Sequence, residues 1–274
     1  MSSSSASTSA ASSILERIFA AKRAELEVER AAVPLEAIRE AARRAPAPRD
    51  LLAALRAHRP AIIAEIKRAS PSRGDILPGL DPAAVAREYA ASGAAAISVL
   101  TDRHFKGSLE DLRTVRAAVN LPLLRKDFIF DPYQLHQARA AGADGILLIA
   151  AMLNEADLRA LYAAAREIGL QALVEVHNED ELRAAGRAGA EIVGINNRDL
   201  HTFVTDIAVT ERLLKDYRGA ALVVSESGID TPEDICRLDR AGARAFLIGE
   251  SLLRGGVPRL RLETLCSALV RSEG

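Results

Sequence analysis

The chain has 274 residues, 49% of them hydrophobic, which is enough to enclose a large core. Its 36 Lys and Arg nearly balance its 37 Asp and Glu, and a net charge of -1 excludes an overall field that attracts nucleic acid or an anionic membrane. No apolar run approaches the ~18 residues of a membrane span, and two cysteines far apart in the sequence indicate the reduced thiols of a cytoplasmic protein.

The first segment of the chain is Ser-rich and uncharged, and it lacks the basic start and the apolar centre of a secretory signal. An organelle transit peptide would also be Ser-rich, but the first Arg is Arg17, so we expect residues 1–13 to be a disordered tail. Residues 14–58 are rich in Ala, Arg, Glu and Leu and are interrupted at Pro34 and around residues 46–48. This pattern predicts an N-terminal helical extension.

From residue 59 onward, short apolar segments alternate with helix-like segments. Eight apolar segments predict strands at residues 61–66, 95–100, 122–124, 145–149, 172–176, 192–195, 221–224 and 245–248. Helical spacing, with Asp, Asn or Thr near each start as a cap, predicts helices at residues 82–92, 109–119, 131–141, 154–168, 179–188 and 231–241. Four of these segments run into a Gly-containing turn, which is typical of helix ends.

Eight such units predict an α/β fold, a (β/α)8 TIM barrel over residues 59–274, preceded by the helical extension. The alternative is an open doubly wound sheet. That fold usually carries a Gly-rich dinucleotide loop after its first strand, and residues 69–74 do not form such a loop.

Charged and polar residues follow several predicted strands. Glu65 and Lys67 end the first strand and, being two residues apart, lie on one face of it. An ordinary ion pair would explain these two alone, but similar residues recur at the same end of other strands. They are Lys126, Glu175, His177, Asn196, Arg198, Glu226, Ser227, Glu250 and Ser251. Because TIM-barrel active sites lie at the carboxyl ends of strands, we expect these groups to meet and to support acid–base chemistry.

The turns after the seventh and eighth strands predict a phosphate site. Gly228 and Gly249 allow backbone N–H groups to approach an anion, and in TIM barrels these two loops commonly hold a phosphate. Each glycine by itself would more often mark an ordinary turn.

Six blocks of the sequence closely resemble the indole-3-glycerol phosphate synthase family of tryptophan biosynthesis. The blocks are residues 63–72, 124–128, 173–177, 194–200, 225–229 and 246–249. The resemblance implies a carboxy-lyase that needs neither metal nor cofactor. Its reaction would be ring closure, decarboxylation and dehydration of 1-(2-carboxyphenylamino)-1-deoxyribulose 5-phosphate. The resemblance also implies that residues 14–58 cover the barrel mouth.

The resemblance further implies catalytic roles for Glu65, Lys67, Lys126 and Glu175. Lys126 would protonate the carbonyl during ring closure, and we expect its pKa to be lowered by burial and neighbouring cations. Glu175 and Lys67 would share the acid and base steps of dehydration, including removal of the anilino proton, with Glu65 positioning them. The resemblance does not divide these two steps between the residues.

The remaining residues are expected to bind the substrate. Contacts to its aromatic and ribulose parts are expected from Ser70, Phe105, Phe128, Asn196, Arg198, Glu226 and Ser227. Contacts to its phosphate are expected from Lys67, Ser70, Gly228, Gly249, Glu250 and Ser251. For Phe105, ordinary loop packing is an equal alternative. We expect the Glu250 carboxylate to point away from the phosphate while its backbone N–H faces it.

Two other functions are less compatible with these residues. Phosphoribosylanthranilate isomerase needs a Cys and an Asp near strand ends, but Cys236 and Cys266 lie elsewhere. A non-catalytic phosphosugar-binding protein would not need two lysines and three glutamates. His177 is expected to pack or donate hydrogen bonds rather than bind a metal. We expect a small phosphosugar substrate, no nucleic-acid or membrane partner, and a monomer or weak homo-oligomer, with association with tryptophan-pathway enzymes left open.

Overall fold

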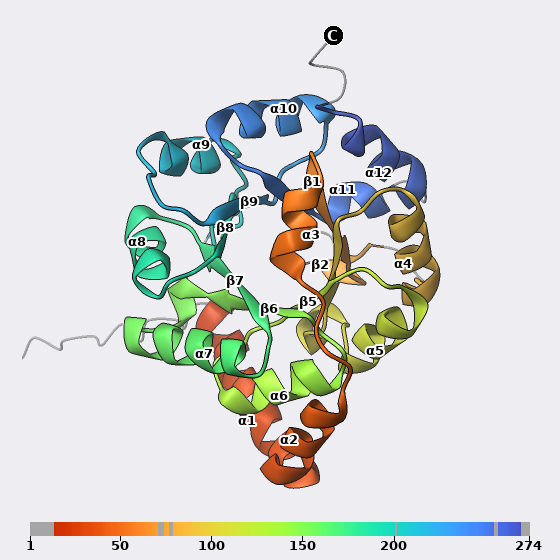
Figure 1. The fold of residues 1–274 in the computed structure, drawn as a ribbon, viewed down its shortest axis with the longest axis vertical. Helices are drawn as coiled ribbons and strands as arrows, with labels where there is room; N and C mark the ends of the chain where they lie inside the picture. The colour runs from red at the N-terminus through yellow and green to blue at the C-terminus, as the bar shows by residue number, and fades with distance from the viewer. Residues whose placement is uncertain (1–13, 71–73, 77–78, 201, 255–256, 270–274) are drawn as a thin grey trace, which may run out of the picture.

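The computed structural model describes residues 14–70, 74–76, 79–200, 202–254 and 257–269, and its centre is a closed barrel of eight parallel strands (Figure 1). The strands are β1 (Ala61–Ile66), β4 (Ala96–Leu100), β5 (Leu123–Lys126), β6 (Gly145–Ile149), β7 (Gln171–Val176), β8 (Ile192–Asn196), β9 (Leu222–Glu226) and β10 (Ala245–Ile248). They pair in chain order, and β10 closes the barrel against β1. The predicted (β/α)8 barrel is confirmed. A two-stranded ribbon of β2 (Ala69–Ser70) and β3 (Gly74–Asp75) follows β1.

Helices follow the barrel strands and lie on the outside of the barrel (Figure 1). They are α4 (Pro82–Ala91), α5 (Leu109–Ala118), α6 (Pro132–Ala140), α7 (Glu155–Glu167), α8 (Glu179–Arg187), α9 (Ala208–Lys215), α10 (Pro232–Ala241), α11 (Glu250–Leu253) and α12 (Pro258–Cys266). The predicted caps are present, because Asp81, Asp131 and Thr231 accept hydrogen bonds from first-turn N–H groups. The sequence analysis missed α9, α11 and α12, all of which begin without a side-chain cap.

The extension consists of α1 (Ile14–Ala32), α2 (Leu35–Arg44) and α3 (Leu51–Ala57). Figure 1 shows α3 across one open end of the barrel, where its leucines pack against residues at the strand starts. α2 packs against α6. α1 reaches the opposite end, where Lys22 pairs with aspartates that follow β4 and β5. The extension therefore contacts both ends of the barrel, whereas the sequence analysis considered the mouth alone. The tail predicted for residues 1–13 lies outside the described residues.

The strands alternate between an outer and an inner face. On β1, Ile62 and Ala64 face the helices, whereas Ala61 and Ile63 belong to the cluster that fills the barrel interior together with α3. The same alternation directs the next odd-numbered side chain, Glu65, toward the inside. None of the helices among the described residues is both long and apolar enough to cross a membrane.

Candidate active site

Charged residues continue the inward face of four strands at their carboxyl ends. Glu65 continues the face of Ile63 on β1, and the corresponding residues on β5, β7 and β9 are Lys126, Glu175 and Glu226. The inward residues two positions earlier are apolar and buried in the barrel interior. The charges therefore meet above an apolar floor at the end of the barrel opposite α3.

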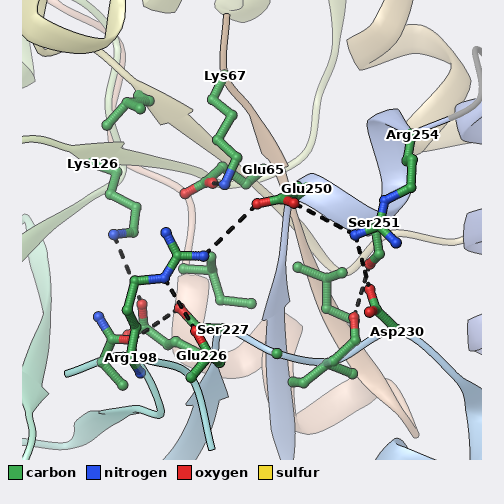
Figure 2. Close-up of a pocket in the computed structure, with 18 of the residues that line it drawn as sticks. Glu65, Lys67, Lys126, Arg198, Glu226, Ser227, Asp230, Glu250, Ser251 and Arg254 are labelled. Carbon is green, nitrogen blue, oxygen red and sulfur yellow. Dashed lines mark hydrogen bonds and ion pairs between the residues drawn. The ribbon is translucent and has the colours of Figure 1, made fainter. Parts of the chain in front are cut away.

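Glu65 and Lys67 form an ion pair with 2.9 Å between Oε1 and Nζ (Figure 2). Burial alone would raise the pKa of Glu65, but the charges of Lys67 and Lys126 lower it below its ordinary value. Gly249, after β10, makes room for this carboxylate, because a Cβ at Gly249 would lie 2.5 Å from Glu65 Oε1. The glycine predicted to serve the phosphate thus also accommodates the ion pair.

Lys126 lies between two glutamates. Its Nζ is 3.6 Å from Glu175 Oε2. The same Nζ is 4.0 Å from Glu226 Oε2 (Figure 2). Burial acts to lower the pKa of Lys126, but the carboxylates of Glu175, Glu226 and Glu65 together raise it above its ordinary value. The expectation of a lowered pKa for Lys126 is therefore wrong, since carboxylates rather than cations surround the ammonium group.

Glu226 is a buried carboxyl group that lacks hydrogen-bond donors in the described part of the chain. Neither of its carboxylate oxygens has a hydrogen-bond partner among the described residues. Burial and the nearby charges of Glu175 and Glu65 raise its pKa to about 8, despite the opposing effect of Lys126. Glu226 therefore retains a proton to higher pH than an ordinary glutamate, and in its protonated form it is able to donate a hydrogen bond.

A polar wall is built between β8 and β9. Asn196 Oδ1 accepts hydrogen bonds from Ser227 Oγ at 2.9 Å and from the Arg198 backbone N–H at 3.0 Å. Ser227 has a left-handed backbone, with φ of 68°, which non-glycine residues rarely adopt. Thr205 accepts from Arg198 Nε at 3.3 Å and is a wall residue that the sequence analysis missed. The wall therefore depends on one amide oxygen and one strained turn.

The rim of the same pocket carries two arginines. Arg198 Nη2 lies 3.8 Å from Glu250 Oε2, and Arg254 Nη2 lies 3.5 Å from Glu250 Oε1 and 3.7 Å from Asp230 Oδ1 (Figure 2). The Glu250 carboxylate therefore lies between two arginines at the rim, and its orientation relative to the phosphate stays a prediction. The Ser251 hydroxyl donates to the Ile229 carbonyl at 2.8 Å, so only its backbone N–H can serve an anion.

An apolar cavity adjoins this polar pocket and shares Lys126, Asn196, Arg198 and Phe105 with it. Phe105 and Phe128 line the apolar cavity, with ring centroids 6.5 Å apart. Further lining residues that the sequence analysis missed are Arg17, Ile18, Leu147, Ile149, Leu200 and Phe203. The cavity thus offers an apolar slot beside the charged groups, and α1 of the extension forms part of it.

The structure also places most of the remaining residues that the sequence analysis singled out. Gly228 follows Ser227 in the polar pocket, and a Cβ there would lie 2.6 Å from the Thr205 methyl carbon. The side chain of Ser70 lies outside the described part of the chain. Cys236 and Cys266 belong to α10 and α12, away from both cavities. Within the described ranges, no group of three or more His, Cys, Asp or Glu side chains could hold a metal ion.

Comparisons with known proteins show the family to which the chain is similar. The family model described as "Indole-3-glycerol phosphate synthase" matches residues 15–265. The indole-3-glycerol phosphate synthase of Roseiflexus sp. (strain RS-1) is 54% identical over 250 residues, covering 88% of this chain and 93% of the relative. The synthase of Chromobacterium violaceum is 48% identical over 259 residues, covering 93% of this chain and 98% of the relative.

A solved structure shares the fold alone. Thiamine phosphate pyrophosphorylase from Pyrococcus furiosus matches with a TM-score of 0.60 at 17% identity, covering 82% of this chain and all of that one. The sequence relatives carry more information, because both are near 50% identical and are covered almost completely. The chain belongs to the indole-3-glycerol phosphate synthase family.

Proposed function

We propose that this pocket closes the indole ring of 1-(2-carboxyphenylamino)-1-deoxyribulose 5-phosphate, with loss of CO₂ and water. Membership of the family makes the chain a carboxy-lyase of tryptophan biosynthesis that acts on a small phosphosugar. The observation that supports the assignment of roles is the position of Lys126. It lies between two glutamates where the polar pocket and the apolar cavity meet.

The two cavities suggest how the substrate lies. The apolar cavity, lined by Phe105 and Phe128, suits the carboxyphenyl ring. The polar pocket runs from Lys126 to the turns after β9 and β10, where Gly228, Gly249 and the Ser251 backbone would approach the phosphate. Lys67 and Ser70 would complete the phosphate site from the β1 side. The reacting C2′ carbonyl then lies between the two cavities, near Lys126.

Ring closure requires the carbon that bears the carboxylate to attack the C2′ carbonyl, whose oxygen becomes an alkoxide. The raised pKa of Lys126 keeps its ammonium group charged before the substrate binds. Transfer of its proton to the oxygen is favourable because the alcohol that forms is a weaker acid than an alkylammonium ion. Loss of CO₂ then restores the aromatic ring.

Dehydration requires an acid for the departing hydroxyl and a base for the proton that the substrate loses. Glu175 faces Lys126 across the pocket, and Lys67 is paired with Glu65 on β1. Glu175 and Lys67 carry out the acid and base steps, and Glu65 positions Lys67. Asn196, Arg198 and Ser227 orient the ribulose chain and the carboxylate, and protonated Glu226 donates a hydrogen bond to the substrate.

The test is an assay of the purified protein with the carboxyphenylamino-deoxyribulose phosphate and excess chelator, without added metal. We expect the fluorescence emission of indole to grow with time. A well-folded protein that forms no indole product would contradict the proposal. We further expect the protein to act in the cytoplasm as a monomer or weak homo-oligomer, which sedimentation of the purified protein would test.

A further inference from the structure

Two consecutive asparagines lie at the end of β8, and their side chains point in opposite directions. Asn196 is the last residue of β8 and lines both cavities. Successive side chains of a strand alternate between its two faces, so Asn197 points outward, toward α9. It is 1% exposed and lines neither cavity. Its buried amide therefore needs hydrogen-bond partners from the protein itself.

The Asn197 amide closes a ring with two hydroxyl groups. Its Oδ1 accepts hydrogen bonds from the Thr210 backbone N–H at 3.1 Å and from the Thr210 hydroxyl at 2.8 Å. Its Nδ2 donates to Ser225 Oγ and to the Ser227 carbonyl, both at 3.0 Å. The Thr210 and Ser225 hydroxyl oxygens lie 2.8 Å apart, which completes the ring. An amide accepts two hydrogen bonds and donates two, so all four are made and the amide has one favourable orientation.

The ring joins the end of β9 to the start of α9. The N-cap residue of α9, Ile207, makes no side-chain hydrogen bond to the helix, and Asn197 Oδ1 accepts the first-turn N–H of Thr210 in its place. The backbone N–H of Asn197 donates to the Glu226 carbonyl at 2.9 Å, and its carbonyl accepts from the Asp206 N–H at 3.0 Å. Asn197 is thus bonded to β9, to the loop before α9 and to α9 itself.

The turn after β9 has an unusual backbone that these bonds hold in place. Ser227 and Gly228 both have left-handed backbones, with φ of 68° and 77°. Serine rarely adopts this conformation, and glycine permits rotation of the peptide unit between the two residues. Ser227 is fixed at two points, because Asn196 Oδ1 accepts from its hydroxyl at 2.9 Å and Asn197 Nδ2 donates to its carbonyl. The second of these bonds fixes the peptide unit itself.

The direction of this peptide unit decides where the Gly228 N–H points. The peptide bond is trans, so the Ser227 carbonyl and the Gly228 N–H point in opposite directions. The carbonyl points outward to Asn197, and the N–H therefore points back toward the polar pocket, which Gly228 lines. A backbone N–H in such a turn is suited to bind an anion. Asn197 thus directs a donor into a pocket that its own side chain does not enter.

We propose that Asn197 is a positioning residue for the phosphate of the substrate, because its Nδ2 holds the Ser227 carbonyl so that the Gly228 N–H faces the phosphate. This inference rests on the proposed function and adds to its phosphate site a residue that does not touch the substrate. The phosphate takes no part in the bonds that form and break. The hold on the turn therefore stabilises the bound substrate and the transition state alike, which affects KM rather than kcat.

The test compares two variants of the ring that have nearly the shape of the wild type. Asn197→Asp keeps an oxygen for the N–H and hydroxyl of Thr210, and the Ser225 hydroxyl is able to turn toward the other oxygen. It replaces the donor to the Ser227 carbonyl with an acceptor, so the two oxygens repel each other. Thr210→Val is the matched control, because it removes a hydroxyl of the ring and leaves the bond from Asn197 to Ser227 in place.

The measurements are the dissociation constant of inorganic phosphate by titration calorimetry, steady-state kinetics, and urea unfolding. For Asn197→Asp we expect the dissociation constant and KM to rise roughly 10- to 100-fold, because a charge-assisted hydrogen bond is lost, while kcat changes less than about threefold. Thr210→Val should lower the free energy of unfolding but leave both constants near the wild-type values. Unchanged constants in Asn197→Asp, or an equal rise in both variants, would overturn the inference.

If Asn197→Asp does not fold, nuclear magnetic resonance of the wild type provides the test. We expect the Gly228 N–H resonance to shift when inorganic phosphate is added, and the side-chain N–H protons of Asn197 to exchange slowly with solvent. An unmoved Gly228 resonance or rapid exchange at Asn197 would overturn the inference. A wild type that shows the expected shift and slow exchange but forms no indole product would support the inference and contradict the proposed function alone.

Discussion

Two clusters of buried charge lie side by side in this molecule, and they differ in how their hydrogen bonds are satisfied. We call Lys22, Asp102, Asp127, Arg125 and Thr101 the anchor cluster, and Glu65, Lys67, Lys126, Glu175 and Glu226 the pocket cluster. In the anchor cluster, both oxygens of Asp127 are engaged, by Lys22 and the Phe128 N–H on one side and by Thr101 and Arg125 on the other. In the pocket cluster, Glu226 and one oxygen of Glu175 have no hydrogen-bond partner among the described residues.

The two clusters shift the pKa of equally buried carboxyl groups in opposite directions. Although burial raises the pKa of Asp127, its cations and hydrogen-bond donors lower it to about 2. Burial and neighbouring carboxylates raise that of Glu226 to about 8. Burial alone therefore does not decide the charge of a carboxyl group. The number of cations and hydrogen-bond donors next to its oxygens decides it. The anchor cluster is not saturated throughout, because Asp102 Oδ2 also has no hydrogen-bond partner among the described residues, although it lies 3.0 Å from Lys22 Nζ. A carboxyl group short of donors, such as Glu226, retains affinity for protons, whereas the donors around Asp127 keep it ionised.

The largest expected effect is on turnover, within the pocket cluster. Lys126→Met should fold normally but lose turnover by about 10³-fold or more, because Lys126 is the group proposed to protonate the carbonyl. The assay is the growth of indole emission, and the control is Lys215→Met at an exposed position of α9. Substantial activity in a folded Lys126→Met protein would rule out the acid role.

The anchor cluster should respond mainly in stability. Lys22→Met leaves Asp102 buried without this cation and leaves Asp127 paired with Arg125 alone, so we expect the free energy of unfolding to fall by about 3–5 kcal/mol. Urea unfolding measures this change. Arg39→Met is a matched control, because Arg39 forms only an exposed ion pair on α2. An unchanged stability in Lys22→Met would mean that α1 is not held by these charges.

A pH-dependent stability effect should distinguish the two clusters. Folded Glu226 keeps its proton up to about pH 8, whereas the ordinary value is 4.5. Its stabilising contribution is therefore complete below about pH 4.5 and is lost as the pH rises through 8. We expect Glu226→Gln to be more stable than wild type at pH 8, by more than about 1 kcal/mol, and similar at pH 4.5. A stability difference independent of pH would contradict the raised pKa.

The smallest expected effect concerns the apolar cavity between the clusters. Phe105 lies on the turn η1 (Arg103–Phe105), which Asp102 of the anchor cluster caps through the His104 N–H. Phe105→Ala should raise KM roughly 10-fold, through lost apolar contact, with a smaller change in kcat. Steady-state kinetics measure this change. If kcat fell while KM stayed constant, Phe105 would not bind the aromatic ring in the ground state.

The sequence predicts the strands and the inward charges well, because both follow from short-range patterns. Side chains along a strand alternate between its two faces, and this alternation alone predicts which charged residues lie on the inner face of the barrel. These residues are Glu65, Lys126, Glu175 and Glu226. It does not predict which of them are nearest to one another. The direction of the Lys126 pKa shift depends on how close the ends of β7 and β9 bring Glu175 and Glu226 to the end of β5, and for that reason the sequence-based expectation was wrong.

Local sequence patterns also do not predict contacts between segments that are far apart in the chain. Ile18 on α1 and Phe203 in the loop after β8 line the apolar cavity, but neither belongs to a motif. Arg198 reaches Glu250 from the loop after β8, and this ion pair joins two segments that are far apart in the sequence. α9 has no side-chain cap, so its start lacks the signal that marks the predicted helices.

The most direct test of the contrast between the clusters is the protonation state of Glu226. The infrared difference spectrum between the wild type and Glu226→Gln isolates this one carboxyl group. We predict the C=O stretch of a protonated acid at pH 7, which is replaced by carboxylate bands as the pH rises through about 8. Carboxylate bands alone at pH 7 would contradict the claim that the pocket cluster is short of hydrogen-bond donors and keeps a proton for this reason.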